Sequence, residues 1–369
     1  MEIKNSTAEQ NAYPVSMDDL LKLTVEKKGS DLHLSAGVPP MARIHGNLVD
    51  LEYPRLTPDN VSDLLQQVLE PFQQEVLQEN WELDFSYSVP GIARFRGNVM
   101  FQRGSLSVSL RVVPYEVPDL DELGLPGVVK DLCKLSRGLV LVTGPTGSGK
   151  STTLASMINL INQTRRESIV TVEDPIEFLH KHNKSSVRQR EVGIDTKSFP
   201  AALRHVLRQD PDVILIGEMR DLDSIAIALT AAETGHLVFS TLHTQTAPLT
   251  ISRIVDVFQD QRREQIRQQL SNTLQGVISQ QLLPTTDGQG RVVAIELMFN
   301  TPAVRNMIRE GKEHQLYSAI QTSKAQGMQT MDSALAALLN AGKISRKMAL
   351  EHCIDRAELE RLVQVQGFG

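Results

Sequence analysis

Short helical and extended patterns alternate over the first third of the chain. Apolar residues recur at helical spacing after Ser16 and again across residues 58–80, which predicts helices in both places. Alternation of polar and apolar residues predicts strands and one hairpin turn, at residues 30–34, 43–48, 83–89, 92–101 and 105–113. We therefore expect an α+β domain over residues 17–114, preceded by a flexible tail at residues 1–16.

A different pattern begins at about residue 137, where short apolar runs are separated by stretches of helical periodicity. Four of these runs predict buried strands, at residues 138–142, 168–172, 212–216 and 236–240. Such alternation is typical of a parallel α/β sheet with helices on its faces. We expect this α/β domain over residues 137–300, a linker rich in proline and acidic residues at 115–136, and a helical region at 301–369.

The first of these apolar runs leads into a glycine-rich loop of the form G-x-x-x-x-G-K-[ST], which a helical pattern follows. In this context, backbone N–H groups and the helix N-terminus bind the phosphates of a nucleoside triphosphate. The lysine is expected to reach the β- and γ-phosphates, and the hydroxyl group after it is expected to bind Mg²⁺. The expected nucleotide-binding residues of this loop are Gly144, Pro145, Thr146, Gly147, Ser148, Gly149, Lys150, Ser151 and Thr152.

Acidic residues follow other strands of the predicted sheet. Parallel strands deliver the side chains at their carboxyl ends to one edge of the sheet, where the ligands of such proteins bind. Glu218 follows the third strand and is expected to hold Mg²⁺ together with Ser151, although Gly217 stands where a further acid would be usual. Glu177 is our candidate for orienting the attacking water, with Glu173 as its rival.

Two histidines, His236 and His243, flank the fourth strand, and Asp174 follows the second. A metal-binding pair of histidines would need a third ligand, and none is evident near them in the sequence. We expect these histidines instead to sense the γ-phosphate or to link adjacent strands. Asp174 is expected to lie beside the nucleotide together with Glu173.

Arginines recur along the strands predicted in the first domain, at Arg94, Arg96, Arg103 and Arg111. One interpretation is a solvated basic face, which is the commoner fate of such residues. The alternative is that they act as arginine fingers. An arginine offered by a neighbouring chain would neutralise charge on the γ-phosphate and couple hydrolysis to subunit contacts.

The composition narrows the choice of partners. A formal net charge of −6 and a pI of about 5.9 give no general attraction to nucleic acid or anionic lipid. No apolar run approaches the ~20 residues of a membrane span, and the polar N-terminus lacks the apolar centre of a signal peptide. Cys133 and Cys353 are too few and too far apart for a disulfide framework or a Cys-x-x-Cys zinc site. We therefore expect a cytoplasmic protein without direct membrane insertion.

Motifs along the whole chain together resemble the secretion and pilus motor ATPases, and more narrowly the PilT family of type IV pilus retraction ATPases. In the α/β domain, the motifs are the Walker A loop GPTGSGKSTT, the Asp box TVEDPIEF, the Walker B segment DPDVILIGEMRD and the His box TAAETGHLVFSTLHT. Upstream, GSDLHLSAGVPPMARIHG resembles the start of that family's PAS-like N-terminal domain. Downstream, TPAVRNMIREGK resembles its retraction motif AIRNLIRE, with conservative changes at Val304 and Met307.

The resemblance covers the chain from about residue 17 to the end, and it implies a PAS-like N-terminal domain followed by a RecA-like P-loop ATPase domain with a helical C-terminal region. It implies that ATP is the nucleotide and that Mg²⁺ accompanies it. Carried over by motif, Glu177 becomes the catalytic glutamate and Glu218 the Walker B glutamate. His236 and His243 become the His-box pair. Among the arginines, Arg96 and Arg111 best match those that reach the nucleotide, and Arg103 matches less securely.

The same resemblance implies a homohexameric motor that hydrolyses ATP to drive pilus retraction and twitching motility. Its expected partner is an inner-membrane platform protein of the PilC kind, and a second retraction ATPase remains open as a further partner. The expected location is the cytoplasm, in peripheral association with the inner-membrane pilus machine. No nucleic acid is expected among the partners.

Rival interpretations come from within and outside this superfamily. Extension and secretion ATPases usually carry a tetracysteine zinc module and a further N-terminal domain, which the two cysteines and short N-terminus argue against. An accessory retraction ATPase of the PilU kind is disfavoured by the near-complete retraction motif. A nucleic-acid translocase is disfavoured by the acidic charge and by the lack of a basic and aromatic stripe. A non-catalytic scaffold is disfavoured by the complete set of Lys150, Ser151, Glu177 and Glu218.

Overall fold

In the computed structural model, the described residues are 13–113, 116–219 and 221–366. They form two units, residues 1–116 and residues 117–369, and each unit is considered by itself. The flexible tail expected at residues 1–16 lies outside the described residues except for its last part, residues 13–16. Among the described residues, no helix combines the length and the apolar composition that a membrane crossing requires.

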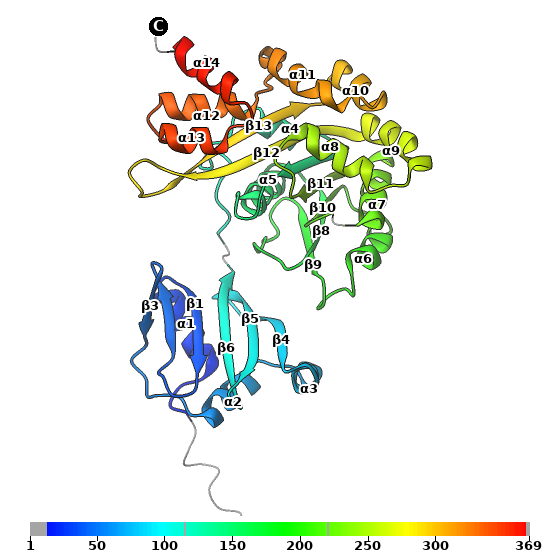
Figure 1. The fold of residues 1–369 in the computed structure, drawn as a ribbon. Helices are drawn as coiled ribbons and strands as arrows, with labels where there is room; N and C mark the ends of the chain where they lie inside the picture. The colour runs from blue at the N-terminus through cyan, green and yellow to red at the C-terminus, as the bar shows by residue number, and fades with distance from the viewer. Residues whose placement is uncertain (1–12, 114–115, 220, 367–369) are drawn as a thin grey trace, which may run out of the picture. The chain divides into compact units, whose positions relative to one another are not determined.

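The first unit is built on a six-stranded antiparallel sheet of strand order β3-β2-β1-β6-β5-β4 (Figure 1). The strands and the hairpin predicted from the sequence are confirmed. The elements are α1 (Met17–Glu26), β1 (Gly29–Ser35), β2 (Met41–Ile44), β3 (Asn47–Asp50), α2 (Pro58–Gln66), α3 (Pro71–Asn80), β4 (Glu82–Val89), β5 (Ala93–Gln102) and β6 (Ser105–Val113).

Residues 58–80 are mostly helical, as the sequence predicts, and they form two helices, α2 and α3. Both helices begin with a proline in the first turn, Pro58 and Pro71, where the missing N–H costs no hydrogen bond. Inside a continuous helix, Pro71 would remove a hydrogen bond and collide with the preceding turn. The chain therefore ends α2 and starts a new helix.

The second unit contains a seven-stranded sheet of order β13-β12-β7-β11-β10-β8-β9 (Figure 1). All neighbouring strands are parallel except the pair β12 and β13. The four predicted strands are confirmed, whereas β9, β12 and β13 are additions that the sequence pattern did not predict. The strands are β7 (Gly138–Thr143), β8 (Ser168–Glu173), β9 (Ser186–Glu191), β10 (Val213–Ile216), β11 (Leu237–Leu242), β12 (Leu274–Pro284) and β13 (Arg291–Phe299).

Helices cover both faces of this sheet, which explains why its strands are continuously apolar. On β7, Leu139 and Leu141 belong to a core shared with α6, α7, α8 and α9, whereas Val140 and Val142 pack with α4 and α5. The helices are α4 (Val129–Leu132), α5 (Lys150–Thr164), α6 (Phe199–Val206), α7 (Leu222–Glu233), α8 (Ala247–Asp256) and α9 (Asp260–Thr273).

The C-terminal part of the second unit is helical, as the pattern beyond residue 300 predicts. It consists of α10 (Pro302–Arg309), α11 (Leu316–Thr322), α12 (Met331–Asn340), α13 (Arg346–His352) and α14 (Arg356–Gln366). The last three of these helices share a core with Leu283 of β12 and Ala294 of β13. The antiparallel strand pair thus joins the parallel sheet to the C-terminal helices.

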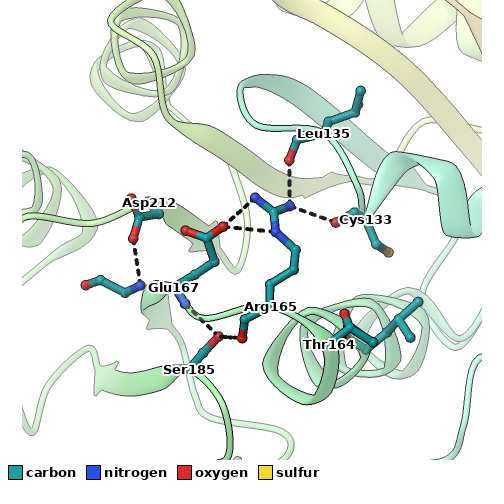
Figure 2. A network of polar contacts seen from close by, with 9 residues as sticks. Cys133, Leu135, Thr164, Arg165, Glu167, Ser185 and Asp212 are labelled. Carbon is teal, nitrogen blue, oxygen red and sulfur yellow. Dashed lines mark hydrogen bonds and ion pairs between the residues drawn. The ribbon is translucent and has the colours of Figure 1, made fainter.

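The segment expected to be a linker, residues 115–136, contributes to the core of the second unit from residue 117 onward. Leu120 and Leu132 are buried there beside α5. Arg165 fixes the end of this segment, because its guanidinium group donates to the carbonyl oxygens of Cys133 (2.8 Å) and Leu135 (2.6 Å), as Figure 2 shows. The same group pairs with Glu167 at 2.7 Å. This segment is therefore anchored beside the first strand of the sheet.

Candidate active site

A cavity of about 400 Å³ lies at the carboxyl ends of β7, β8, β10 and β11. This volume is in the range of small-ligand sites. The residues that line it include groups from each of these strand ends, as the parallel topology predicts. Among them are Thr146, Gly147, Lys150, Ser151, Glu173, Asp174, Glu177, Glu218 and His243. The structure therefore brings together most of the site residues expected from the sequence.

The phosphate loop connects β7 to α5, and its glycines are required by its shape. Gly149 caps α5 with a φ of 89°, in the left-handed region that glycine adopts most readily. A β-carbon on Gly144 would lie 2.2 Å from the carbonyl oxygen of Gln280, so no other residue fits there. The loop then delivers Lys150 and Ser151, in the first turn of α5, to the cavity.

Lys150, His243 and Glu218 form a short polar chain at the cavity. Nζ of Lys150 donates to the carbonyl oxygens of Gly144 (2.9 Å) and Pro145 (3.0 Å), and it lies 3.5 Å from Nδ1 of His243. On the other side of the ring, Nε2 of His243 lies 3.1 Å from a carboxylate oxygen of Glu218. Burial lowers the pKa of Lys150, and the charge of Glu218 opposes that shift. His243 thus links the loop of β7 to the end of β10.

Glu173 and Glu177 differ sharply in their surroundings, although both line the cavity. Glu173 is buried at 8% exposure, and its Oε1 accepts hydrogen bonds from the Thr171 hydroxyl (2.6 Å) and from Nε2 of Gln189 (3.2 Å). Burial raises the pKa of Glu173 to about 7, against the opposing effect of these hydrogen bonds. Glu177 is exposed, on the loop that follows β8.

The oxygen donors at the cavity fit the coordination that Mg²⁺ prefers. Ser151 offers a hydroxyl group and Glu218 a carboxylate on the same cavity. In the described part of the chain, no three histidine, cysteine or acidic side chains gather as a metal site. Mg²⁺ usually takes one or two protein oxygens and completes its shell with water and substrate phosphates. The residues present therefore suit Mg²⁺ bound together with a nucleotide.

His236 does not line the cavity, which corrects the expectation that it binds the nucleotide there. It precedes β11, whereas His243 follows the strand, so the two are roughly 23 Å apart at ~3.3 Å per residue. Nδ1 of His236 lies 2.9 Å from the carbonyl oxygen of Ala231, at the end of α7. The two histidines cannot share a metal ion, and His236 joins β11 to α7.

Gln280 is a residue of this site that the sequence pattern did not reveal. It is buried on β12, and its Nε2 donates to the carbonyl oxygen of Ser148 in the phosphate loop at 2.6 Å. This contact holds a loop carbonyl away from the cavity, which favours N–H groups on the phosphate side. The two residues are 132 positions apart, so only an indication that β12 neighbours β7 could have predicted the contact.

Two of the expected arginines, Arg96 and Arg111, lie side by side on the sheet of the first unit. Arg96 of β5 is directly opposite Arg111 of β6, and Arg111 is opposite Asp31 of β1. Nε of Arg111 donates to Asp31 at 2.8 Å, while its side chain remains 68% exposed. Arg103 lies in the turn between β5 and β6, with a φ of 48°. Arg96 and Arg111 thus form one row, from which Arg103 is separate.

The helix that resembles the retraction motif, α10, has the two faces expected from its sequence. Val304 and Ile308 are fully buried, and Met307 packs partly buried against the same core. Arg305 and Arg309 are exposed. The conservative changes in this motif therefore fall on the buried face, and its charged face is unaltered.

Comparison with known proteins identifies the family. Residues 88–342 match the family described as Type II/IV secretion system protein. The Pseudomonas aeruginosa type IV pilus retraction ATPase PilT is 50% identical over 91% of this chain and 98% of the relative. The twitching motility protein of Neisseria gonorrhoeae is 49% identical over 84% of this chain and 83% of the relative. The type IV pilus ATPase PilU of P. aeruginosa is 41% identical over 95% of this chain and 92% of the relative.

A solved structure agrees with these matches in both fold and sequence. The crystal structure of the pilus retraction motor PilT with bound ADP superimposes with a TM-score of 0.88 at 52% identity. The alignment covers 94% of this chain and 99% of that chain. On these grounds, the chain belongs to the type II/IV secretion system protein family and, within it, to the PilT family of type IV pilus retraction ATPases.

Proposed function

We propose that this chain is a motor ATPase that hydrolyses ATP to retract type IV pili and so drives twitching motility. The observation that carries the proposal is the cavity, where a phosphate loop, Glu177 and Glu218 converge in a chain of the PilT family. Residues 17–114 are then a PAS-like domain, and the segment from residue 117 to residue 136 packs into the second unit. Residues 137–300 form the RecA-like core, which precedes the helical region 301–369.

Hydrolysis requires that the triphosphate be held and that a water be directed at its γ-phosphorus. The N–H groups of the phosphate loop bind the phosphates, and Lys150 exchanges its contacts with loop carbonyls for contacts with phosphate oxygens. Ser151 and Glu218 would hold Mg²⁺, which would supply neutralisation of the charge that develops on the phosphates. His243 keeps Glu218 oriented through the contact at 3.1 Å.

Glu177, rather than Glu173, orients the attacking water. The exposed carboxylate of Glu177 is accessible to a water in the cavity, whereas Glu173 is buried and already bonded to two side chains. A group that directs water must be within hydrogen-bond reach of it and able to accept its proton. Asp174 lines the same cavity, and in the proposed mechanism it lies beside the nucleotide.

The assembly and partners that we propose are those expected for the family. The chain acts as a homohexamer, in which Arg96 and Arg111 approach the nucleotide and stabilise the charge of the transition state, with Arg103 as a further candidate. The motor works in the cytoplasm, at the inner-membrane pilus machine, on a platform protein of the PilC kind. A second retraction ATPase is a further candidate partner. Identity of 50% to PilT against 41% to PilU favours the main retraction motor over the accessory one.

The variant Glu177→Gln tests the enzymatic part of the proposal. The amide cannot take the proton of the attacking water, so ATP turnover should fall by roughly 10²- to 10⁴-fold, while ATP binding stays within a few-fold. Steady-state hydrolysis and binding of a fluorescent ATP analogue measure the two effects. Normal turnover by this variant would remove Glu177 from the mechanism.

Deleting the gene in its source organism tests the biological part. Cells that are rich in surface pili and do not twitch would support retraction, and the intact gene should restore twitching where Glu177→Gln does not. Cells without pili would assign the chain to extension instead. A chain that acts on nucleic acid would instead show ATPase activity that DNA stimulates.

A further inference from the structure

The loop that carries Glu177 is tied to β9, the edge strand of the sheet, through side chains of that strand. Oε1 of Gln189 accepts the N–H of His180 at 2.8 Å, and Nε2 of Gln189 donates to the carbonyl oxygen of Phe178 at 2.9 Å. Two residues along β9, Oε2 of Glu191 accepts the N–H of Ile176 at 3.2 Å. The loop is thus fastened on both sides of Glu177.

The spacing of these contacts follows from strand geometry. Residues two apart on a strand project from the same face, so Gln189 and Glu191 present their polar groups to the same loop. Glu191 is 4% exposed, and in a buried setting an unmade hydrogen bond is costly. These contacts are therefore strong constraints on the path of the loop.

A third contact fixes Glu177 through its own backbone. Its N–H donates to the carboxylate of Glu173, to which Gln189 also donates at 3.2 Å. Glu173 and Glu191 are register partners at the carboxyl ends of β8 and β9. Two buried carboxylates on neighbouring strands therefore hold two consecutive N–H groups of the loop, those of Ile176 and Glu177.

We propose that Gln189 and Glu191 are positioning residues for ATP hydrolysis, which hold the loop after β8 so that the carboxylate of Glu177 meets the attacking water. The proposal rests on the proposed function of Glu177. Neither Gln189 nor Glu191 lines the cavity, so both act through the loop and not on the nucleotide. A displacement of a reacting group by 1 Å costs about 10²-fold in rate, which sets the size of the expected effect.

The test uses Gln189→Ala and Glu191→Ala in the full chain, with Arg190→Ala as the matched control. Arg190 lies between the two on β9 and bonds instead to the carbonyl oxygen of Asp195 at 2.8 Å. The two test variants should lose about 10²-fold in kcat, with KM for ATP and binding of ADP within threefold of the wild type. Arg190→Ala should stay within twofold in both. An unchanged kcat in the test variants, or an equal loss in the control, would overturn the proposal.

A double-mutant cycle separates positioning from a general loss of structure. In a Glu177→Gln background, Glu191→Ala should cause no further loss of kcat, because the residue it positions is already disabled. A further loss of similar size in that background would show that Glu191 acts elsewhere, which would overturn the proposal. If Glu177→Gln alone hydrolyses ATP normally, the assigned role of Glu177 fails first, and the two failures are thereby distinguished.

Conservative variants keep the test decisive where an alanine variant does not fold. Glu191→Gln retains an acceptor oxygen for the N–H of Ile176, so its kcat should stay within threefold of the wild type. Gln189→Glu keeps the acceptor for His180 but loses the donor to Phe178, so its kcat should fall at least tenfold. The opposite ranking of these two variants would overturn the proposal.

Discussion

The cavity of the second unit and the arginine row of the first unit are built on sheets of opposite kinds. In the parallel sheet, chemistry gathers at strand ends, where loops deliver Lys150, Glu177 and Glu218 to one edge. In the antiparallel sheet, chemistry lies on a face, where Arg96 and Arg111 stand side by side across two strands. The first arrangement forms a cavity within the second unit, while the second leaves positive charge on the surface of the first unit.

The two regions also differ in the electrostatic energy of their positively charged side chains. Arg96 and Arg111 are directly opposite on neighbouring strands, and like charges in that position are unfavourable. Asp31 offsets part of this repulsion through its bond to Arg111. At the cavity, Lys150 instead has loop carbonyls as hydrogen-bond partners. The two regions thus stabilise positive charge with different acceptors, a carboxylate for Arg111 and backbone carbonyls for Lys150.

The largest effect should come from removing one arginine of the row while the cavity residues stay intact. Arg96→Ala should lower kcat for ATP by about 10³-fold, the lower end of what an arginine finger contributes. Its binding of ADP should remain within a few-fold of the wild type, because the cavity residues are intact. Hydrolysis assays and ADP titration measure both quantities.

Two variants serve as the controls for that comparison. Arg43→Ala removes an arginine of β2 that lies opposite Asp31 on the side away from Arg111, and it should leave kcat nearly unchanged. Lys150→Ala, by contrast, should lose nucleotide binding itself. Equal losses of kcat in Arg96→Ala and Arg43→Ala would mean that the arginines of this sheet act only by their summed charge.

A smaller effect should follow from Gln280→Leu, because Gln280 contacts the phosphate loop from β12 and does not itself line the cavity. The carbonyl oxygen of Ser148 loses its donor, and an unsatisfied buried group costs ~1–3 kcal/mol, so KM for ATP should rise by about tenfold. Gln281→Leu is the matched control, because the neighbouring amide bonds to His352 of α13 instead. A KM that is unchanged in Gln280→Leu would show that the loop keeps its shape without this contact.

The smallest effect concerns the stability of the first unit. Asp31→Asn should lower its free energy of unfolding by about 1 kcal/mol at pH 7, because Asp31 is buried but the side chain of its partner Arg111 is 68% exposed and screened by solvent. Although burial acts to raise the pKa of Asp31, hydrogen bonds from Ser30 and Arg111 hold it below its usual 3.8. A lowered pKa stabilises the fold above pH ~4 and ceases to do so as the pH falls through the folded-state value.

The difference between Asp31→Asn and the wild type should therefore shrink in acid, and it should shrink in high salt as well. Denaturant unfolding followed at pH 7 and at acidic pH measures the change. A difference that persists at low pH would mean that shape, and not charge, accounts for the contribution of Asp31.

The sequence alone determined much of this protein. The spacing of Gly144, Gly149 and Lys150 predicts the phosphate loop, because the glycines permit the positive-φ backbone that this loop adopts. Continuous apolar runs predict the strands of the parallel sheet, and the strand ends then place Glu177, Glu218 and His243 at one edge. These predictions succeed because they depend on neighbours in the chain and on one general property of parallel sheets.

The tertiary structure decided what depends on partners far apart in sequence. Gln280 reaches the phosphate loop only because β12 pairs with β7, and Gln189 reaches the loop of Glu177 only because β9 pairs with β8. His236 is excluded from the cavity by the length of β11, which the motif containing both histidines does not reveal. A local pattern specifies local shape, whereas strand pairing between distant segments fixes which side chains meet.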